Sequence, residues 1–382
     1  MKTKVILSAD QHLGIFYALR GDIFLKHAMN YFYKQFIPDI KNMMANEPST
    51  HFELILLGDL IDSRNTLPLN ILHSVNELIK TLSDILPVHI ICGNHDIFNK
   101  NTNTINGINH LGWLKNVTVY TETTNINING HDVVLMPWIN QRKEQERQLQ
   151  VFKGKYLFTH TELNGCITNA SKIVHNDPSK IEASSFSGFK RVISGHFHLH
   201  QIIGNFMYLS SIMQFDRNDY GSKKYMGVLD LETDEIKLIE NTTSPIFEKI
   251  IIKKEEDLIK FDSINKNNYI DLEIYNSVIV NSRKTRKKIE SILEQGSFAK
   301  IDYINDLTKI DVITEDKANI ITENIDFTKL NPTTDGSVEF DTIILNYINY
   351  IDYPSDKIKE GVIEEFELVK EKHKILYGNL HS

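Results

Sequence analysis

The chain of 382 residues is predicted to adopt an α/β fold, and two observations point to it. Short apolar runs with the character of buried strands alternate with longer segments whose apolar residues repeat at helical spacing. Five such runs are also followed, within two residues, by aspartate, asparagine or histidine. Because the carboxyl ends of strands in an α/β sheet meet at one edge, these polar groups are expected to converge. The five runs are Lys4–Ser8, Phe52–Leu57, Val88–Cys92, Tyr156–Phe158 and Arg191–Ser194.

Two helices are expected to connect the first three strands. One extends from about Asp22 to Ala45 and the other from Leu69 to Ile85, and each carries an apolar stripe that would face a sheet. After Trp113 the strands become shorter, and a hairpin closes this part of the chain. Two packed sheets with outer helices would accommodate this order. The later elements are expected at Val117–Tyr120, Val133–Met136, Gln141–Gln150, Met226–Leu231 and Ile236–Ile239.

The remainder of the chain has a different organisation. Pro245 interrupts the pattern and indicates a boundary. Strand, short helix, strand, helix and strand then follow up to Ile304, which predicts a small α/β unit. Residues 306–338 are rich in Asp, Asn, Thr and Lys and indicate a partly extended linker, with two helices after it. The expected elements are Glu248–Ile252, Glu255–Phe261, Tyr269–Ile274, Ser282–Gln295, Lys300–Ile304, Glu339–Ile351 and Ser355–Tyr377.

Five polar motifs follow the first five strands. Any one of them is weak evidence, because an Asp-x-His pair or a Gly-Asn-His-Asp segment is more often a turn than part of a site. Their conjunction, in order and each at a strand end, points to one shared site with oxygen and imidazole donors. Such donors, without thiolates, suit Mn²⁺, Fe²⁺ or Zn²⁺ better than Mg²⁺. The motifs are Asp10-Gln11-His12, Gly58-Asp59-Leu60-Ile61-Asp62, Gly93-Asn94-His95-Asp96, Thr159-His160 and Gly195-His196-Phe197-His198.

Together these motifs resemble the pattern of the calcineurin-like metallophosphoesterase superfamily, which is D-x-H, G-D-x-x-D, G-N-H-D/E, H and G-H-x-H. The resemblance implies a two-sheet metallophosphoesterase sandwich flanked by helices, and two divalent cations that acidify a water and clamp a phosphate. It also implies Mn²⁺ as the cation and Asp59 as the bridge between the two ions. One ion would be held by Asp10, His12 and His198, and the other by Asn94, His160 and His196.

The same resemblance gives His95 a catalytic role, in which it protonates the departing sugar oxygen or stabilises the transition state. The alternative is a structural histidine beside the ligands. Asp62 and Asp96 are expected to orient ligands or the His95 ring through hydrogen bonds, without touching metal.

Two further positions bear on this interpretation. Monoesterases of the superfamily usually continue G-D-x-x-D with arginine, whereas here Ser63 follows and Arg64 comes one place late, which argues against that branch. Histidines outside the motifs are expected to be ordinary surface or core residues. His200 is the open case, because in an extended segment it points the same way as His196 and His198.

A narrower resemblance is to the nuclease subunit of SbcCD-type DNA repair complexes, the SbcD family and its phage relatives. Asp10-Gln11-His12-Leu13-Gly14 matches the D-x-H-L-G opening of that family, and Tyr208–Gln214 is similar to its Y-x-G-S segment, with Ser210 in place of Gly. The chain also continues well beyond the catalytic motifs. This resemblance implies four parts, namely a catalytic domain at 1–245, a DNA-orienting capping domain at 246–306, a linker at 307–338 and a helical segment at 339–382.

The family resemblance also implies a function and partners. The activity would be that of a DNA exonuclease and endonuclease acting at double-strand ends during repair or recombination, in a homodimer bound to an SMC-like coiled-coil ATPase. The C-terminal helix is amphipathic, so it could instead pack on its own chain. The alternatives are a phosphoesterase acting on small molecules or phosphoproteins, and a non-enzymatic scaffold that bridges DNA ends.

Charge and cysteine content limit these options. The formal charge of −8 is unlike that of a free-standing DNA-binding protein, for which a basic face would be expected. The one dense basic run could contact phosphates or could simply be a solvated helix face. Cys92 and Cys166 fit no disulfide or metal pattern, and no leader or membrane span is recognisable, so a cytoplasmic location in a bacterium or a virus-infected cell is expected. The basic run comprises Arg283, Lys284, Arg286, Lys287 and Lys288.

Overall fold

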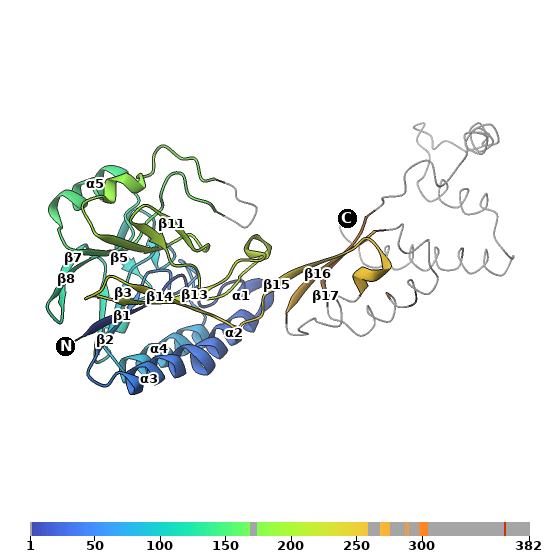
Figure 1. Cartoon of the computed structure of the whole chain (residues 1–382), viewed down its shortest axis with the longest axis horizontal. Helices are drawn as coiled ribbons and strands as arrows, with labels where there is room; N and C mark the ends of the chain where they lie inside the picture. Colours follow the sequence, from blue (N-terminus) through green and yellow to red (C-terminus); the bar gives the residue numbers. More distant parts are fainter. Residues whose placement is uncertain are drawn as a thin grey trace, which may run out of the picture. The chain divides into compact units, whose positions relative to one another are not determined.

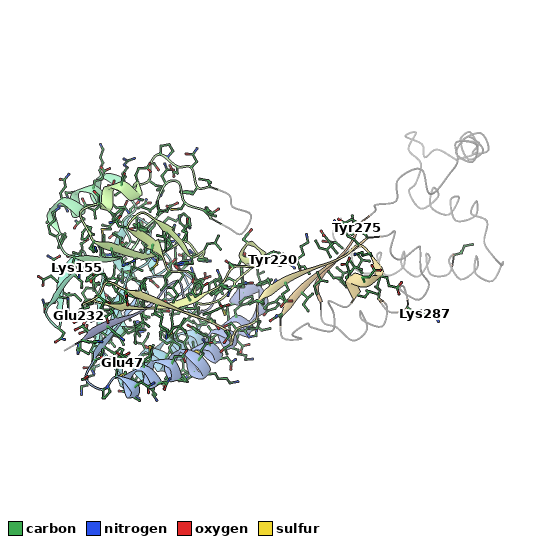
Figure 2. All side chains as sticks on the ribbon, in the orientation of Figure 1. Glu47, Lys155, Tyr220, Glu232, Tyr275 and Lys287 are labelled. Atoms are coloured by element: carbon green, nitrogen blue, oxygen red, sulfur yellow. The ribbon has the colours of Figure 1, made fainter. Side chains whose placement is uncertain are left out.

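The computed structural model describes residues 2–168, 174–258, 268–275 and 298–304, together with Lys287, Ile289 and Ile363. Residues 1–305 form one compact unit, whose described helices and strands are drawn in colour in Figure 1, and residues 306–382 are assigned to a second. The predicted linker and the two C-terminal helices lie outside the described residues, apart from Ile363. The helix expected at Ser282–Gln295 also lies outside them, except that Lys287 and Ile289 are helical and Lys287 is exposed (Figure 2). The boundary at Pro245 stays a prediction.

The first large sheet is built around the three strands that precede the first three motifs. β1 (Thr3–Ser8), β2 (His51–Leu56), β3 (Val88–Ile91) and β6 (Val117–Tyr120) are parallel neighbours. β13 (Tyr225–Asp230) adds to β1 in the antiparallel sense and β14 (Ile236–Glu240) follows it as the predicted hairpin. The order is β14-β13-β1-β2-β3-β6. The ends of β1, β2 and β3 therefore lie at one edge.

The second large sheet contains the strands that precede the last two motifs. β9 (Tyr156–His160) lies between β8 (His131–Met136) and β10 (Arg191–Gly195), and all three are parallel. β12 (Phe206–Tyr208) extends the parallel part, while β7 (Thr124–Ile128) and β11 (Gln201–Ile203) are antiparallel edge strands. The order is β11-β12-β10-β9-β8-β7. The predicted architecture of two sheets with outer helices is confirmed.

The helices lie where the apolar stripes predicted them. α4 (Leu69–Ser83) connects β2 to β3, and a longer helical run connects β1 to β2. That run consists of α2 (Ile23–Tyr31), the π-helical turn η1 (Phe32–Phe36) and α3 (Ile37–Asn46). The wide turn ends two positions before Pro38, whose ring would clash with the carbonyl of residue 34 in a regular α-helix. α5 (Arg142–Val151) covers the second sheet near the short helix η3 (Ala183–Phe186).

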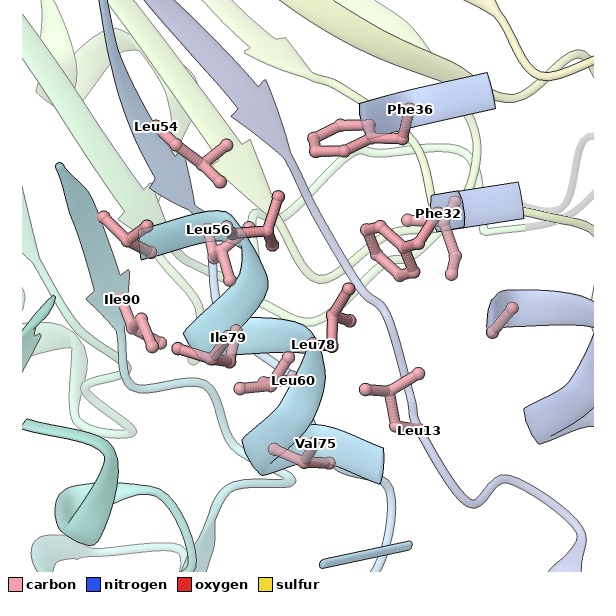
Figure 3. Close-up of a cluster of buried hydrophobic side chains, with 14 of the residues drawn as sticks. Leu13, Phe32, Phe36, Leu54, Leu56, Leu60, Val75, Leu78, Ile79 and Ile90 are labelled. Atoms are coloured by element: carbon pink, nitrogen blue, oxygen red, sulfur yellow. The ribbon is translucent and has the colours of Figure 1, made fainter. Parts of the chain in front are cut away.

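The core follows from the alternation of side chains along each strand. On β1, Ile6 faces the helices, whereas Val5 and Leu7 face the second sheet. On β2, Leu54 and Leu56 face the helices in the same way. Figure 3 shows this layer, in which strand residues meet α4 and the π-helical turn. Strands of the first sheet are thus covered by helices on one face and by the second sheet on the other. Because both faces are buried, these strands are continuously apolar in sequence.

Several short elements were not predicted. The hairpin of β4 (Ile97–Asn99) and β5 (Thr102–Asn106), the edge strands β7 and β11, strand β12 and the four-residue helix α1 (Tyr17–Arg20) all escaped notice. β5 and β7 have the sequences TNTIN and TNINI, whose asparagines indicate loops. Pairing with a neighbouring strand overrides that local preference.

A smaller parallel sheet follows the hairpin, as the pattern beyond Pro245 predicted. It contains β15 (Phe247–Ile252), β16 (Tyr269–Tyr275) and β17 (Phe298–Ile304) in that order. Within the first unit it packs against α2, because the Tyr269 ring on β16 stacks on the ring of Phe24 from α2 as well as on that of Phe247 from β15. Every helix among the described residues is too short or too polar to cross a membrane.

We predict that Leu78→Ala lowers the free energy of unfolding by about 2–5 kcal/mol, because it opens a cavity under the first sheet. Leu78 is 1% exposed on α4, whereas Leu69, on the same helix, is 82% exposed and gives a matched control in Leu69→Ala. Urea unfolding monitored by circular dichroism measures both. Equal losses for the two variants would contradict the burial of Leu78 against the first sheet.

Candidate metal centre

The five motifs meet at the carboxyl ends of the strands that precede them. Three groups of side chains, each with ligand atoms within 4.8 Å of one another, lie there. All seven predicted metal ligands are in or beside these groups, so residues from position 10 to position 198 share one place. The groups are Asp10, His12 and His198; His12, Asp62 and His95; and Asp59, His160 and His196.

In the first group, several side-chain nitrogen and oxygen atoms have no ordinary hydrogen-bond partner. The Nε2 atoms of His12 and His198 face each other at 3.1 Å. Nδ1 of His12 is already occupied by Asp62 Oδ1 at 3.1 Å. Asp10 Oδ1 accepts the amide of His196 at 2.8 Å, but its buried Oδ2 has no hydrogen-bond partner among the described residues. Two facing imidazole nitrogens and an unpaired buried carboxylate oxygen fit a cation between them.

The second group is arranged around the amide oxygen of Asn94. That oxygen lies 3.0 Å from His160 Nε2 and 2.9 Å from His196 Nδ1. His160 is oriented by its other nitrogen, since Nδ1 lies 2.8 Å from the carbonyl oxygen of Leu57 and must be protonated to bond it. Nε2 is therefore the atom that faces the group. An amide oxygen, two imidazoles and a carboxylate again fit a divalent cation.

Asp59 lies between the two groups. Its Oδ2 is 3.2 Å from His160 Nε2 and 3.6 Å from His12 Nε2, so one oxygen faces nitrogens of both sets. Oδ1 accepts the backbone amide of His95 at 2.7 Å, which fixes the plane of the carboxylate. A carboxylate held in this way can contact two cations at once.

The backbone around these carboxylates is strained and tightly packed. Asp10, His12 and Asp59 have φ values of 49°, 43° and 53°, in the left-handed region that non-glycine residues rarely adopt. A Cβ at Gly93 would lie 2.2 Å from both the amide nitrogen and Oδ1 of Asp59. Glycine is therefore needed there so that the third motif can approach the second. Sequence reasoning recognised the glycine only as a turn residue.

Burial of several carboxylates in one place raises the electrostatic cost of their charge. Burial and the neighbouring Asp59 raise the pKa of Asp10 to about 6 and that of Asp96 to about 7. His160 is also buried, which would lower its pKa, but the attraction of Asp59 and Asp10 raises that pKa to about 9. Burial holds the pKa of His196 and of His198 well below the ordinary value, so both are neutral donors. The site thus has an excess of buried negative charge and imidazoles able to bind cations.

His95 lies at the open side of the cluster. Its Nδ1 donates to the backbone oxygen of Asp62 at 2.8 Å, and its ring meets that of His12 edge to face at 4.8 Å. Burial lowers the pKa of His95, so the ring is neutral near pH 7. Because the carbonyl can only accept a hydrogen bond, the Nδ1 proton is fixed there and Nε2 is left for a substrate.

The two remaining acidic residues of the motifs play different parts. Asp62 bonds the His12 ring through its carboxylate and the His95 ring through its carbonyl. Asp96 bonds neither a ligand side chain nor the His95 ring. Its oxygens instead accept the amides of Ile61 at 3.0 Å and Gly93 at 2.8 Å, which ties the second motif to the third.

Other predicted positions lie apart from the cluster. His200 bonds the carbonyl of Tyr208 and does not join the metal groups, although it alternates with His196 and His198. Arg64 donates from Nε to the carbonyl of Asn94 at 2.8 Å, so it supports the third motif. Cys92 and Cys166 are buried free thiols. Of the predicted DNA-contacting run, Arg283, Lys284, Arg286 and Lys288 lie outside the described residues, and Lys287 is exposed.

Sequence reasoning missed three residues that surround the cluster. The Trp138 ring stacks on His196 with centroids 5.2 Å apart, and Phe215 packs edge to face on His12 and His198. Lys224 is buried behind the last motif. Trp138 could have been noticed, since it comes two residues after a predicted strand. Phe215 and Lys224 carry no comparable signal.

Comparison with known proteins agrees with this geometry. The calcineurin-like phosphoesterase family matches residues 4–200, just over half of the chain, and the chain belongs to that family. It is also a distant homologue of Exonuclease subunit 1 of Enterobacteria phage T4, at 27% identity over 194 residues, which is 50% of this chain and 56% of the relative.

Two further proteins are similar over part of the chain. "Putative phosphoesterase 078R" of Invertebrate iridescent virus 3 is 26% identical over 203 residues, 51% of this chain and 56% of that protein. The chain thus spans about half the length of the curated relatives it matches. A solved archaeal phosphodiesterase superposes with a TM-score of 0.29 and 11% identity, over 62% of this chain and 99% of the other.

We predict that Mn²⁺ binding at pH 7 releases a proton. His160 has a pKa of about 9 and is mainly protonated at pH 7, whereas a metal-bound nitrogen must be unprotonated. Affinity should therefore rise with pH, by roughly tenfold per unit for this group, until about pH 9. Calorimetry in two buffers of different ionisation enthalpy measures the release. The His95→Gln variant changes no predicted ligand and should still release the proton. If the unaltered chain released no proton, the assignment of His160 as a metal ligand would be contradicted.

Proposed function

We propose that this protein is a two-metal DNA nuclease, acting as exonuclease and endonuclease at DNA ends, with Mn²⁺ as its native cation. The position of Asp59 Oδ2 between the two donor groups carries the proposal, because a shared carboxylate is what a pair of cations requires. Asp10, His12 and His198 would hold one cation, and Asn94, His160 and His196 the other. The bound pair would supply a hydroxide nucleophile and neutralise charge on the phosphodiester.

The protein's own residues then perform the remaining tasks. Asp62 holds His12 and His95 at fixed angles, and Asp96 holds the second and third motifs together. The Nε2 of His95 has no hydrogen while the ring is neutral, so it can donate a hydrogen bond to a phosphodiester oxygen only once it is protonated. When that nitrogen carries a proton it can pass it to the departing sugar oxygen.

Support for DNA as the substrate comes from the distant homologue named as an exonuclease subunit and from the D-x-H-L-G opening. By that resemblance, the β15–β17 sheet is the core of a capping domain at 246–306 that orients DNA. The basic run at 283–288 would contact phosphates, and the segment at 339–382 would bind an SMC-like ATPase. The chain would act in double-strand-break repair or recombination as a homodimer.

We predict that His95→Gln lowers cleavage of linear duplex DNA in Mn²⁺ by about 10²–10⁴-fold, because it removes an acid–base group and leaves every proposed ligand in place. Bis-p-nitrophenyl phosphate and p-nitrophenyl phosphate serve as diester and monoester comparisons, and His200→Gln is the matched control. Preference of the unaltered chain for the monoester would overturn the nuclease proposal. A lack of bound transition metal in protein prepared without chelator would favour the scaffold instead.

The partner proposal has its own test. Co-expression with a coiled-coil ATPase of the same source should give a complex that survives size-exclusion chromatography, and removal of residues 339–377 should release the ATPase. Retention of the complex by the shortened chain would show that these residues do not bind the partner.

A further inference from the structure

The segment between β12 and β13 forms one wall of the metal centre. We name residues 214–224 of this segment the 214–224 turn. Its Phe215 ring is 2% exposed and packs edge to face on His12 and His198, with centroid distances of 5.5 and 5.4 Å. Both histidines belong to the same predicted cation site. A shift of this ring would therefore move two proposed ligands of one cation.

A buried ion pair fixes the turn to the last motif. The Lys224 side chain is 3% exposed, and its Nζ donates to the carbonyl of His198 at 2.8 Å and to Asp219 Oδ1 at 2.6 Å. The other oxygen of Asp219 accepts the amide of Phe215 at 2.9 Å. Buried ion pairs are often no more stabilising than apolar replacements. What this one does supply is a fixed position for the His198 backbone and the Phe215 ring together.

The opposite side of the turn is fixed to the smaller sheet. Arg217 donates to both carboxylate oxygens of Asp271 on β16, from Nε at 2.5 Å and Nη2 at 3.0 Å. The Tyr220 hydroxyl, on the residue labelled in Figure 2, bonds the same carboxylate. Gln214 Oε1 accepts the amide of Phe247, at the start of β15, at 2.7 Å. Bidentate contacts of this kind set orientation as well as distance.

We propose that the 214–224 turn positions the His12 and His198 side of the metal centre and couples it to the β15–β17 sheet, with Lys224 and Asp271 as positioning residues. This inference rests on the proposed function, because it requires that His12 and His198 hold one of the two cations. The other cation site is supported differently, since His196 stacks on Trp138. Coupling is reciprocal, so DNA or a partner that moves the sheet would change the affinity for one cation more than for the other.

The test compares two substitutions on β16. Asp271→Asn weakens the bidentate contact to the turn. Glu273→Gln removes an ion pair from the same strand, but that pair joins Glu273 to Lys249 of β15 at 2.8 Å and stays inside the smaller sheet. Binding of Mn²⁺ is counted by paramagnetic resonance of the free ion. Thermal unfolding of each variant shows that it is folded.

The chain offers a reporter for the other cation site. It has two tryptophans, of which Trp113 is 89% exposed and Trp138 is 5% exposed beside His196. In a Trp113→Phe background, the emission of Trp138 follows occupancy of the His160 and His196 group. The two readouts together therefore show which cation is affected.

Asp271→Asn is expected to lower the affinity for one of the two Mn²⁺ ions by about fivefold or more, which is the lower end of typical coupling between sites. The Mn²⁺ concentration at the midpoint of the Trp138 emission change should stay the same. Glu273→Gln should match the unaltered chain. Arg217→Gln should lower the same Mn²⁺ affinity as Asp271→Asn does. The variant that carries both substitutions should lose no more affinity than either single variant, because the two residues form one contact. Two ions bound with unchanged affinities in Asp271→Asn would overturn the coupling and leave the proposed function intact. Fewer than two ions on the unaltered chain would overturn the proposed function and this inference with it.

Discussion

Burial of Asp10 and Asp59 between the carboxyl ends of two facing sheets is the constraint on which the site depends. Two carboxylates without solvent repel each other and are stable as anions only beside positive charge or hydrogen-bond donors. The chain supplies some of this through the amides of His95 and His196, which bond one oxygen of each carboxylate. The second oxygens face imidazoles or have no partner among the described residues. That incomplete compensation is what makes the cluster a cation site.

The surrounding structure holds this arrangement against its strain. The left-handed backbone at the carboxylates persists because the amides of the first motif bond the carbonyls of the second, with Asp10 bonded to Gly58 and His12 to Asp59. Asp96 then bonds the second motif to the third, which explains why a buried carboxylate without a ligand role belongs there. Rigidity of this kind keeps ligands near their positions before any cation arrives.

Much of the fold followed from local pattern. Strands buried on both faces gave uninterrupted apolar runs, and α4 showed a clear helical period, so these elements were predictable. The asparagine-rich strands β5 and β7 were not, because their pairing partners decide their conformation. The same distinction applies to the site. Asp59 and His160 stood in motifs, whereas Phe215 and Lys224 reach the cluster only through the folded path of the chain.

By itself, then, the sequence determined the order of the main strands and helices and which donor residues stand at strand ends, because both are properties of short segments. Only the tertiary structure decided that Asp59 Oδ2 faces both His12 and His160, that Asp96 holds backbone instead of a ring, and that His200 turns away. These outcomes depend on angles between loops from different strands. Such angles are fixed by packing and by long-range hydrogen bonds, which no local pattern encodes.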